Sequence, residues 1–280
     1  MIATPIPRET LLHVVRKLPA APHILAQLDE LLSDTNSDMS DITALLKCDM
    51  ALTARIIRIS NSAFYNSGKP YASLEESLAR VGFNEIYRLA GLAAVAQMSD
   101  YALKFYGITG PRLRENSLLT ALVMEALSGF ANVDPRMAYT AGLLRSVGKI
   151  ALDRLTRDTA YAGNHDGREQ GGLAAWETGV IGLNNCEASA VILSEWRFPT
   201  TTIAAIRDHY LLNPGAGLLA NLLNLAAGAA ERGDHGLPGE TVYWEPSLAR
   251  FEAAGVQPEN VDEAMWRALK LFGALRSAVS

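Results

Sequence analysis

The side chains that most often do chemistry are few and scattered in this chain of 280 residues. The five histidines show no H-E-x-x-H or similar metal-binding spacing, and they lie at His13, His23, His165, His209 and His235. The two cysteines, Cys48 and Cys186, form no C-x-x-C pair, which argues against a zinc ribbon, an iron–sulfur centre or a redox dithiol. No G-x-S-x-G, Walker A or G-x-G-x-x-G motif occurs. Local motifs therefore predict no catalytic constellation and no resident cofactor.

A set of basic residues provides candidates for binding an anion instead. Arg145 and Lys149 are one helical turn apart, and Arg112 and Arg114 lie near the start of another predicted helix. His209 lies at the end of a predicted helix, where its alternative role is a favourable contact with the helix dipole. Guanidinium groups recognise phosphate through paired hydrogen bonds. These residues are the candidates for contacts with a phosphorylated ligand.

Two aromatic pairs are candidates for contact with a partner protein. Phe64 and Tyr65 follow a predicted helix and precede the loop S-G-K-P at residues 67–70. Tyr243 and Trp244 lie in a polar loop, and aromatic side chains are frequent energetic centres of protein interfaces. The alternative for both pairs is packing against the protein's own core.

Composition limits the class of protein. Hydrophobic residues make up 49% of the chain and charged residues 20%, which is a globular composition. The formal charge of −5 lacks the basic footprint of a nucleic-acid binder, so we expect no nucleic-acid partner. The N-terminus has no signal-peptide core, and no long run of uncharged apolar residues occurs elsewhere. We therefore expect a soluble, cytoplasmic protein without membrane contact.

Helix signals recur along almost the whole chain and would position these residues. Apolar spacing predicts a first helix from 22 to 32, Ser40 and Asp49 are predicted N-caps, and a capping box at Ser73 begins a helix that stops at Gly82. Further helices are predicted over residues 85–98, 113–130, 135–148, 174–177, 185–196, 200–210, 215–231, 247–254 and 260–272, with a glycine-rich loop between 158 and 182. No stretch shows the alternation of a strand, so the predicted fold is all-α.

Several short motifs occur in series. They are P-x-x-P-H at 19–23, D-M-A-L-T-A-R-I-I-R-I-S-N-S-A-F-Y at 49–65, S-L-E-E-S-L-A-R-V-G-F at 73–83, G-L-L-R-S-V-G-K at 142–149, E-A-S-A-x-x-L-x-E-W-x-x-P at 187–199 and A-I-R-D-H-Y at 205–210. In combination they resemble the HDOD family over roughly residues 11–230. The resemblance implies two helical subdomains, an HDOD-specific one over residues 1–105 and a degenerate HD-like one over 106–232, followed by a C-terminal helical extension over 233–280.

The resemblance also implies where a related HD phosphohydrolase would bind its metal. Such enzymes use a His, a His-Asp doublet and a later Asp to hold metal ions that activate water. The corresponding positions here are Asn116, Arg145, Ser146 and Asn224. A permanent cation, two amides and a serine make a poor site for a divalent ion. We therefore expect no bound metal and no enzymatic activity.

Arg112, Arg114, Arg145 and Lys149 converge on this vacated site in the resemblance. Either Arg145 fills the space and pairs with a carboxylate of the chain, or the cations bind the phosphate of a ligand. We predict a carboxylate partner, because an unpaired buried charge is very costly. The candidates in the sequence are Glu115, Asp153, Glu187 and Asp208.

HDOD proteins are bacterial and are generally regarded as signalling or regulatory modules. The resemblance therefore implies a non-catalytic module that contacts an unidentified signalling protein. A module that binds a nucleotide or another phosphorylated ligand is the alternative, and a cryptic phosphohydrolase with relocated ligands is the least favoured hypothesis.

Overall fold

The computed structural model describes residues 6–19, 21–66, 68–157, 172–211, 214–244 and 246–279. These residues form helices and connecting turns, and extended backbone pairs within them at one isolated bridge, between Leu103 and Ile108. The predicted all-α fold is confirmed. Within the same residues, no helix has the length and apolarity needed to cross a membrane.

In the first part of the chain, α6 is the helix on which α2, α4 and α5 pack, whereas α1 packs on helices of the second part. The helices are α1 (Arg8–Val15), α2 (Ala21–Ser33), α3 (Met39–Lys47), α4 (Met50–Ser60), α5 (Leu74–Val81) and α6 (Phe83–Met98), and both α2 and α4 lie against α6. Helix α3 begins one residue before the predicted cap Ser40, because Asp38 accepts bonds from the backbone N–H groups of Ser40 and Asp41. Asp49 and Ser73 cap α4 and α5 as predicted, and Gly82 ends α5 with a φ of 87°.

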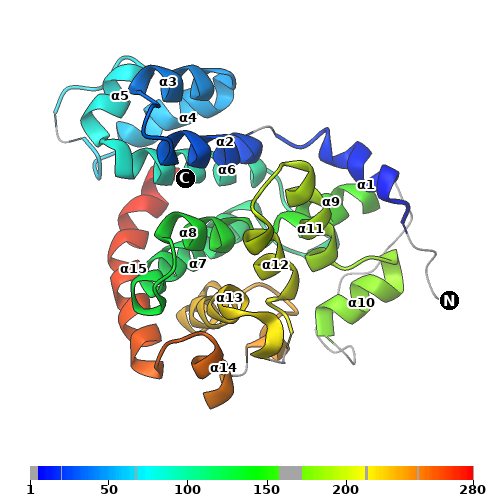
Figure 1. Cartoon of the computed structure of the whole chain (residues 1–280). Helices are drawn as coiled ribbons and strands as arrows, with labels where there is room; N and C mark the ends of the chain where they lie inside the picture. The colour runs from blue at the N-terminus through cyan, green and yellow to red at the C-terminus, as the bar shows by residue number, and fades with distance from the viewer. Residues whose placement is uncertain are drawn as a thin grey trace.

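The second part is built on the long helix α7 (Gly110–Ala131), which contacts α8, α13 and α15 (Figure 1). The other elements here are η1 (Lys104–Tyr106), α8 (Pro135–Leu144), α9 (Val147–Thr156), α10 (Gly172–Ile181), α11 (Asn185–Glu195), α12 (Thr200–Asp208), η2 (Pro214–Ala216) and α13 (Leu218–Ala230). Helix α10 is longer than the predicted 174–177 segment, and residues 158–171 of the predicted glycine-rich loop lie outside the described residues.

The helix predicted over residues 135–148 is two helices, and this correction matters for the site. Helix α8 ends at Leu144 and α9 begins at Val147, so that Arg145 lies at the junction. Gly148 packs so closely on α11 that a Cβ would lie 1.9 Å from the carbonyl oxygen of Asn185, and its N–H donates to Ser189 Oγ. The break between the helices accompanies this close contact.

The C-terminal part of the chain packs mainly against α7 and α13 of the second part. It contains η3 (Glu231–His235), η4 (Thr241–Tyr243), α14 (Leu248–Ala253) and α15 (Pro258–Val279), and α15 lies along α7 (Figure 1). Helix α15 is longer than the predicted 260–272 segment, because its buried face extends to Leu275. We call residues 231–244, which follow α13, the connecting segment. The division at residues 105 and 232 stays a prediction.

Candidate functional site

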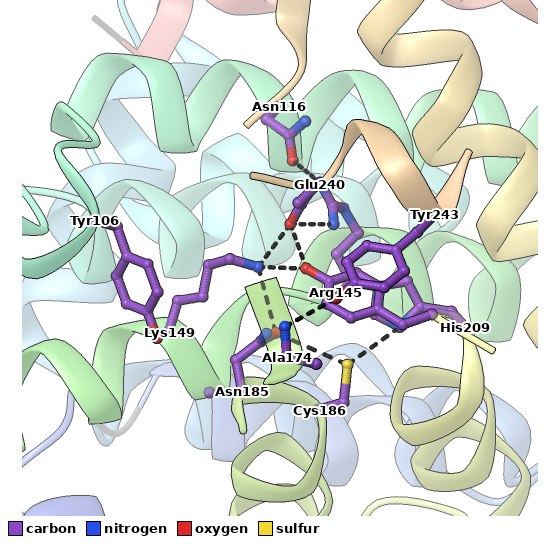
Figure 2. A network of polar contacts seen from close by, with 12 residues as sticks. Tyr106, Asn116, Arg145, Lys149, Ala174, Asn185, Cys186, His209, Glu240 and Tyr243 are labelled. Carbon is purple, nitrogen blue, oxygen red and sulfur yellow. Dashed lines mark hydrogen bonds and ion pairs between the residues drawn. The ribbon is translucent and has the colours of Figure 1, made fainter. Parts of the chain in front are cut away.

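A buried cluster of charged residues lies at the junction of α8 and α9. Arg145 donates from both terminal nitrogens to the carboxylate of Glu240, at 3.0 and 2.8 Å, and Lys149 Nζ lies 2.6 Å from Glu240 Oε1. At most 1% of each of these side chains is exposed. Two cations from the α8–α9 junction thus share one carboxylate from the connecting segment (Figure 2).

Neutral polar groups complete the hydrogen bonding of this cluster. Asn116 Oδ1 on α7 accepts a bond of 2.6 Å from Arg145. The hydroxyl of Tyr210 accepts from Lys149 at 2.7 Å and donates to Glu240 Oε1 at 2.6 Å. We refer to Asn116, Arg145, Lys149, Tyr210 and Glu240 as the Arg145 network. Its members come from α7, the α8–α9 junction, the end of α12 and the connecting segment, so four distant parts of the chain meet there.

The network holds its charges in the ionised form. Burial alone would raise the pKa of Glu240, but Arg145 and Lys149 lower it well below its usual range. Burial alone would lower the pKa of Arg145, and Glu240 outweighs that effect and raises it. The salt bridge is therefore formed across the physiological pH range, as expected for buried opposite charges that are also hydrogen-bonded.

His209 is buried beside the network and is neutral. Burial and the charge of Arg145 lower the pKa of His209 to about 3. Its Nδ1 atom lies 2.7 Å from the carbonyl oxygen of Ile206 in the last turn of α12. A neutral imidazole offers no positive charge to an anion, and the structure contains the helix-end contact. The assignment of His209 as an anion contact stays a prediction.

A second buried carboxylate, Glu177 on α10, borders the network. Tyr106 donates to it at 2.6 Å, and the backbone and side chain of Asn185 donate at 2.8 Å each. Burial raises the pKa of Glu177 in spite of Lys149 and these donors. Asn185 also accepts from Lys149 at 3.3 Å and so connects the two carboxylates. Local sequence contains no motif around Glu240 or Glu177, and of the missed residues Tyr210 alone belongs to a recognised motif, A-I-R-D-H-Y.

The predicted set of cations does not converge. Arg112 donates to the carbonyl oxygens of Asp234 and Gly236 in the connecting segment, at 2.6 and 2.8 Å. Arg114 donates to the carbonyl oxygen of Ser99 at 3.1 Å. Both guanidinium groups are therefore engaged by backbone outside the Arg145 network, and only Arg145 and Lys149 of the predicted anion contacts lie within it.

The four predicted metal-ligand positions are all buried but are only partly brought together. Asn116 and Arg145 are in direct contact, and Asn116 Nδ2 also donates to the carbonyl oxygen of His235. Asn224 donates to the carbonyl oxygens of His209 and Tyr243, at 2.8 Å each, and so supports the backbone beside the network. Ser146 instead lines a small space together with residues of α6, α7, α8 and α9.

The predicted partner of Arg145 was a carboxylate of the chain, and the structure contains one, although it is none of the four candidates. Glu115 pairs with His235 and Arg276, and Asp153 pairs with Arg157. Glu187 belongs to the capping box of α11 and Asp208 pairs with its neighbour Arg207. All four candidates are thus engaged by groups other than Arg145.

The aromatic residues differ in exposure. Tyr243 and Trp244 are buried, which contradicts their prediction as a partner surface. Tyr243 stacks on Tyr210 with ring centroids 4.1 Å apart, and the guanidinium carbon of Arg145 lies 5.6 Å from the Trp244 ring centroid. Phe64 is 41% exposed, whereas Tyr65 is half-buried with its hydroxyl bonded to Glu85.

The described residues contain no group of three His, Cys, Asp or Glu side chains arranged to hold a metal ion. What the Arg145 network can do chemically follows from its charges. A bidentate guanidinium–carboxylate pair with an adjacent ammonium joins separate helices, and its donors would suit a phosphate if Glu240 were absent.

The helical order and packing define an all-helical protein whose fold has solved counterparts. A Geobacter sulfurreducens protein described as an HDOD domain protein of unknown function is similar over 97% of both chains, with a TM-score of 0.62 and 19% sequence identity. A Shewanella amazonensis SB2B protein provisionally named a phosphohydrolase is similar over 96% of this chain and 97% of its own, with a TM-score of 0.61 and 20% identity. At these identities the likeness establishes the fold alone.

The family is established by sequence. The family model for the HDOD domain matches residues 18–212, and the chain belongs to the HDOD family. A Marinobacter aquaeolei VT8 protein provisionally named a signal transduction protein has a TM-score of 0.67 and 18% identity, over 97% of this chain and 64% of its own. An uncharacterised Treponema pallidum protein is 23% identical over 205 residues, which is 70% of this chain and 38% of that protein's length.

Proposed function

We propose that this protein is a non-catalytic signalling module that acts through contact with a partner protein. One observation carries the proposal, namely the buried salt bridge of Arg145 with Glu240 at a position where a related hydrolase would hold a metal ion. Metal-dependent hydrolysis needs a cation that lowers the pKa of a bound water. A permanent guanidinium repels such a cation, and its carboxylate partner is already neutralised.

Membership of the HDOD family is compatible with either a regulatory or a catalytic role, because a fold does not determine a function. Names of similar structures point both ways, toward signal transduction in one case and toward phosphohydrolysis in another. The residues of this chain favour the regulatory role. Arg145 and Asn116 bond to each other, and Asn224 is occupied by backbone carbonyl groups.

Metal analysis combined with a phosphoesterase assay tests the proposal. We expect the purified protein to carry no stoichiometric Mn, Fe, Ni, Zn or Mg and to leave phosphomonoesters, phosphodiesters and cyclic dinucleotides intact when each metal is added. An active HD hydrolase assayed in parallel controls for the conditions. About one tightly held ion per chain, lost when Asn116 or Asn224 is replaced, would contradict the proposal, as would turnover that Arg145→Ala changes.

A module for a phosphorylated ligand is the second candidate, and one observation favours it. Arg145 Nε, His209 Nε2 and Trp244 Nε1 are buried atoms with no hydrogen-bond partner among the described residues. Such atoms are rare in folded proteins. A thermal-shift screen separates the candidates. Stabilisation by a nucleotide supports ligand binding, and stabilisation by a metal supports hydrolysis. If neither compound stabilises the protein, the result favours the partner-protein role.

A further inference from the structure

The carboxylate of Glu240 is held in the way that a bound anion is held. Arg145 Nη1, Lys149 Nζ and the hydroxyl of Tyr210 donate to Oε1 at 3.0, 2.6 and 2.6 Å, and Arg145 Nη2 donates to Oε2 at 2.8 Å. The donors belong to the α8–α9 junction and the end of α12, whereas Glu240 comes from the connecting segment (Figure 2). Charged donors that converge on two oxygens form an arrangement that recognises carboxylate or phosphate.

The positive charge of this site exceeds what Glu240 offsets. Two cations face one carboxylate, so the Arg145 network has a formal charge of +1. The neighbouring carboxylate, Glu177, takes its hydrogen bonds from Tyr106 and Asn185, and burial raises its pKa. It therefore does not supply a second negative charge in direct contact with the cations. A phosphate group carries about 1.5–2 negative charges at neutral pH and matches both cations.

One buried donor of the site is left unused by Glu240. Arg145 Nε has no hydrogen-bond partner among the described residues, and only 1% of this side chain is exposed. Such a buried N–H group is rare, because it has lost its bonds to water without gaining others. Both oxygens of Glu240 are already on the terminal nitrogens of Arg145, so none remains for Nε. A phosphate has further oxygens that can accept from it.

The chain that carries Glu240 forms a thin cover over the site. Glu240 is fully buried, whereas Thr241 and Val242 directly after it are exposed. The backbone N–H of Glu240 bonds within the connecting segment, to the carbonyl oxygen of Leu237. A cavity of about 600 Å³ adjoins the same turn and is lined by Leu237 and by residues at the start of α7. The turn of residues 236–242, which we call the Glu240 turn, therefore borders both solvent and a cavity.

We propose that Glu240 is an internal anion that occupies a phosphate-binding site, and that a ligand with a phosphate group competes with it for Arg145 and Lys149. The bound phosphate displaces the Glu240 turn and so changes the surface that this turn presents to a partner protein. The proposal rests on the non-catalytic role proposed above, because the phosphate is bound and not cleaved.

Isothermal titration of the full chain with inorganic phosphate, at constant ionic strength, tests the site. A carboxylate tethered beside its cations competes at high effective concentration, so Glu240→Ala should bind phosphate at least about tenfold more tightly than the wild-type protein. Adding Arg145→Met to Glu240→Ala should weaken that binding by at least about tenfold. Glu259→Ala is the matched control, because it removes an exposed acid in the first turn of α15 and should bind phosphate as the wild-type protein does.

Hydrogen exchange of the wild-type protein tests the displacement without any substitution. Inorganic phosphate should increase the exchange of the backbone amides in the Glu240 turn, and the increase should saturate with phosphate concentration. Potassium chloride at the same ionic strength should leave this exchange unchanged. Helix α3, which packs on α2 and α4, provides the internal reference, and its exchange should be the same in both salts.

Four results would overturn the proposal. They are the absence of saturable phosphate binding by folded Glu240→Ala, equal phosphate affinity of Glu240→Ala and the wild-type protein, full binding after Arg145→Met is added, and unchanged exchange of the Glu240 turn in phosphate. Circular dichroism shows whether each variant has folded, and if Glu240→Ala has not, the exchange experiment decides. Turnover of a phosphomonoester would contradict the non-catalytic role, whereas loss of phosphate binding alone would leave that role intact.

Discussion

Replacing Glu240 by glutamine removes the one carboxylate that Arg145 and Lys149 share while keeping the shape of the side chain. The buried charges change from two cations with one anion to two cations with none. Replacing Arg145 by methionine removes one cation instead, and it leaves the Lys149–Glu240 ion pair, whose net charge is zero, in a similar volume. The two variants therefore separate the cost of unpaired charge from the cost of lost packing.

The expected magnitude follows from the burial of the network. Leaving a buried charge without its partner costs about 3–5 kcal/mol. For a chain of this size, about 1 kcal/mol shifts the thermal midpoint by about 2 °C, so Glu240→Gln should lower the midpoint by about 6–10 °C. Arg145→Met should cost clearly less than Glu240→Gln. Glu259→Gln, which is exposed, should leave the midpoint unchanged.

The pH dependence of the difference in unfolding free energy between the wild-type protein and Glu240→Gln provides a second readout. The pKa of Glu240 is lowered from an ordinary value of 4.5, so in acid the unfolded chain takes up a proton that the folded chain does not. The contribution of the salt bridge is complete above pH 4.5 and is lost as the pH falls below it. The gap in unfolding free energy between wild-type protein and Glu240→Gln should therefore be constant from pH 5 to 8 and should narrow below about pH 4.5.

Chemical denaturation across this pH range, followed by circular dichroism, measures the gap. A structural role for the network would be refuted by a midpoint shift of one degree or less, by Arg145→Met costing more than Glu240→Gln, or by a gap that does not change with pH.

Three further predictions concern other residues. His209 is neutral when buried and its pKa lies below the ordinary 6.5, so as the pH falls the unfolded chain binds a proton before the folded chain does. Between pH 6.5 and 4.5, His209→Gln should therefore lose less stability than the wild-type protein. Denaturation curves measure this loss, and a steeper loss in the variant would contradict the prediction. Gly148→Ala should destabilise the protein by several kcal/mol, because its Cβ would meet the carbonyl oxygen of Asn185. Gly129→Ala, which has open space around it, should be neutral or stabilising by up to about 1 kcal/mol. Equal thermal midpoints of the two variants would contradict the close packing of α9 on α11. Phe64→Asp should leave the midpoint unchanged and reduce recovery of co-purifying proteins from the native cell, and unchanged recovery would remove Phe64 from the partner surface.

Much of the fold could be predicted from local sequence, because helix caps and apolar spacing act over a few residues. Asp49, Ser73 and Gly82 have the roles that their positions predict, since a cap bonds to backbone within three residues. The break between α8 and α9 could not be predicted in this way. It accompanies the packing of Gly148 on Asn185 of α11, which lies far along the chain.

Local sequence was also insufficient to predict all residues of the candidate site. The sequence resemblance predicts that Asn116, Arg145 and Asn224 occupy the positions of metal ligands in related hydrolases, and burial predicts a carboxylate partner for the arginine. It did not identify Glu240, because 95 positions separate Glu240 from Arg145 and no local motif marks it. The need for a counter-charge is a property of burial and can be read from a sequence, but its source depends on which segment the fold brings there.

By itself, therefore, the sequence determined an all-helical protein of the HDOD family. The tertiary structure alone decided that Glu240 pairs with both Arg145 and Lys149 and that Tyr243 and Trp244 are buried. The physical reason is that caps and periodicity act within a helix, whereas burial and charge pairing depend on packing between segments that are remote in sequence.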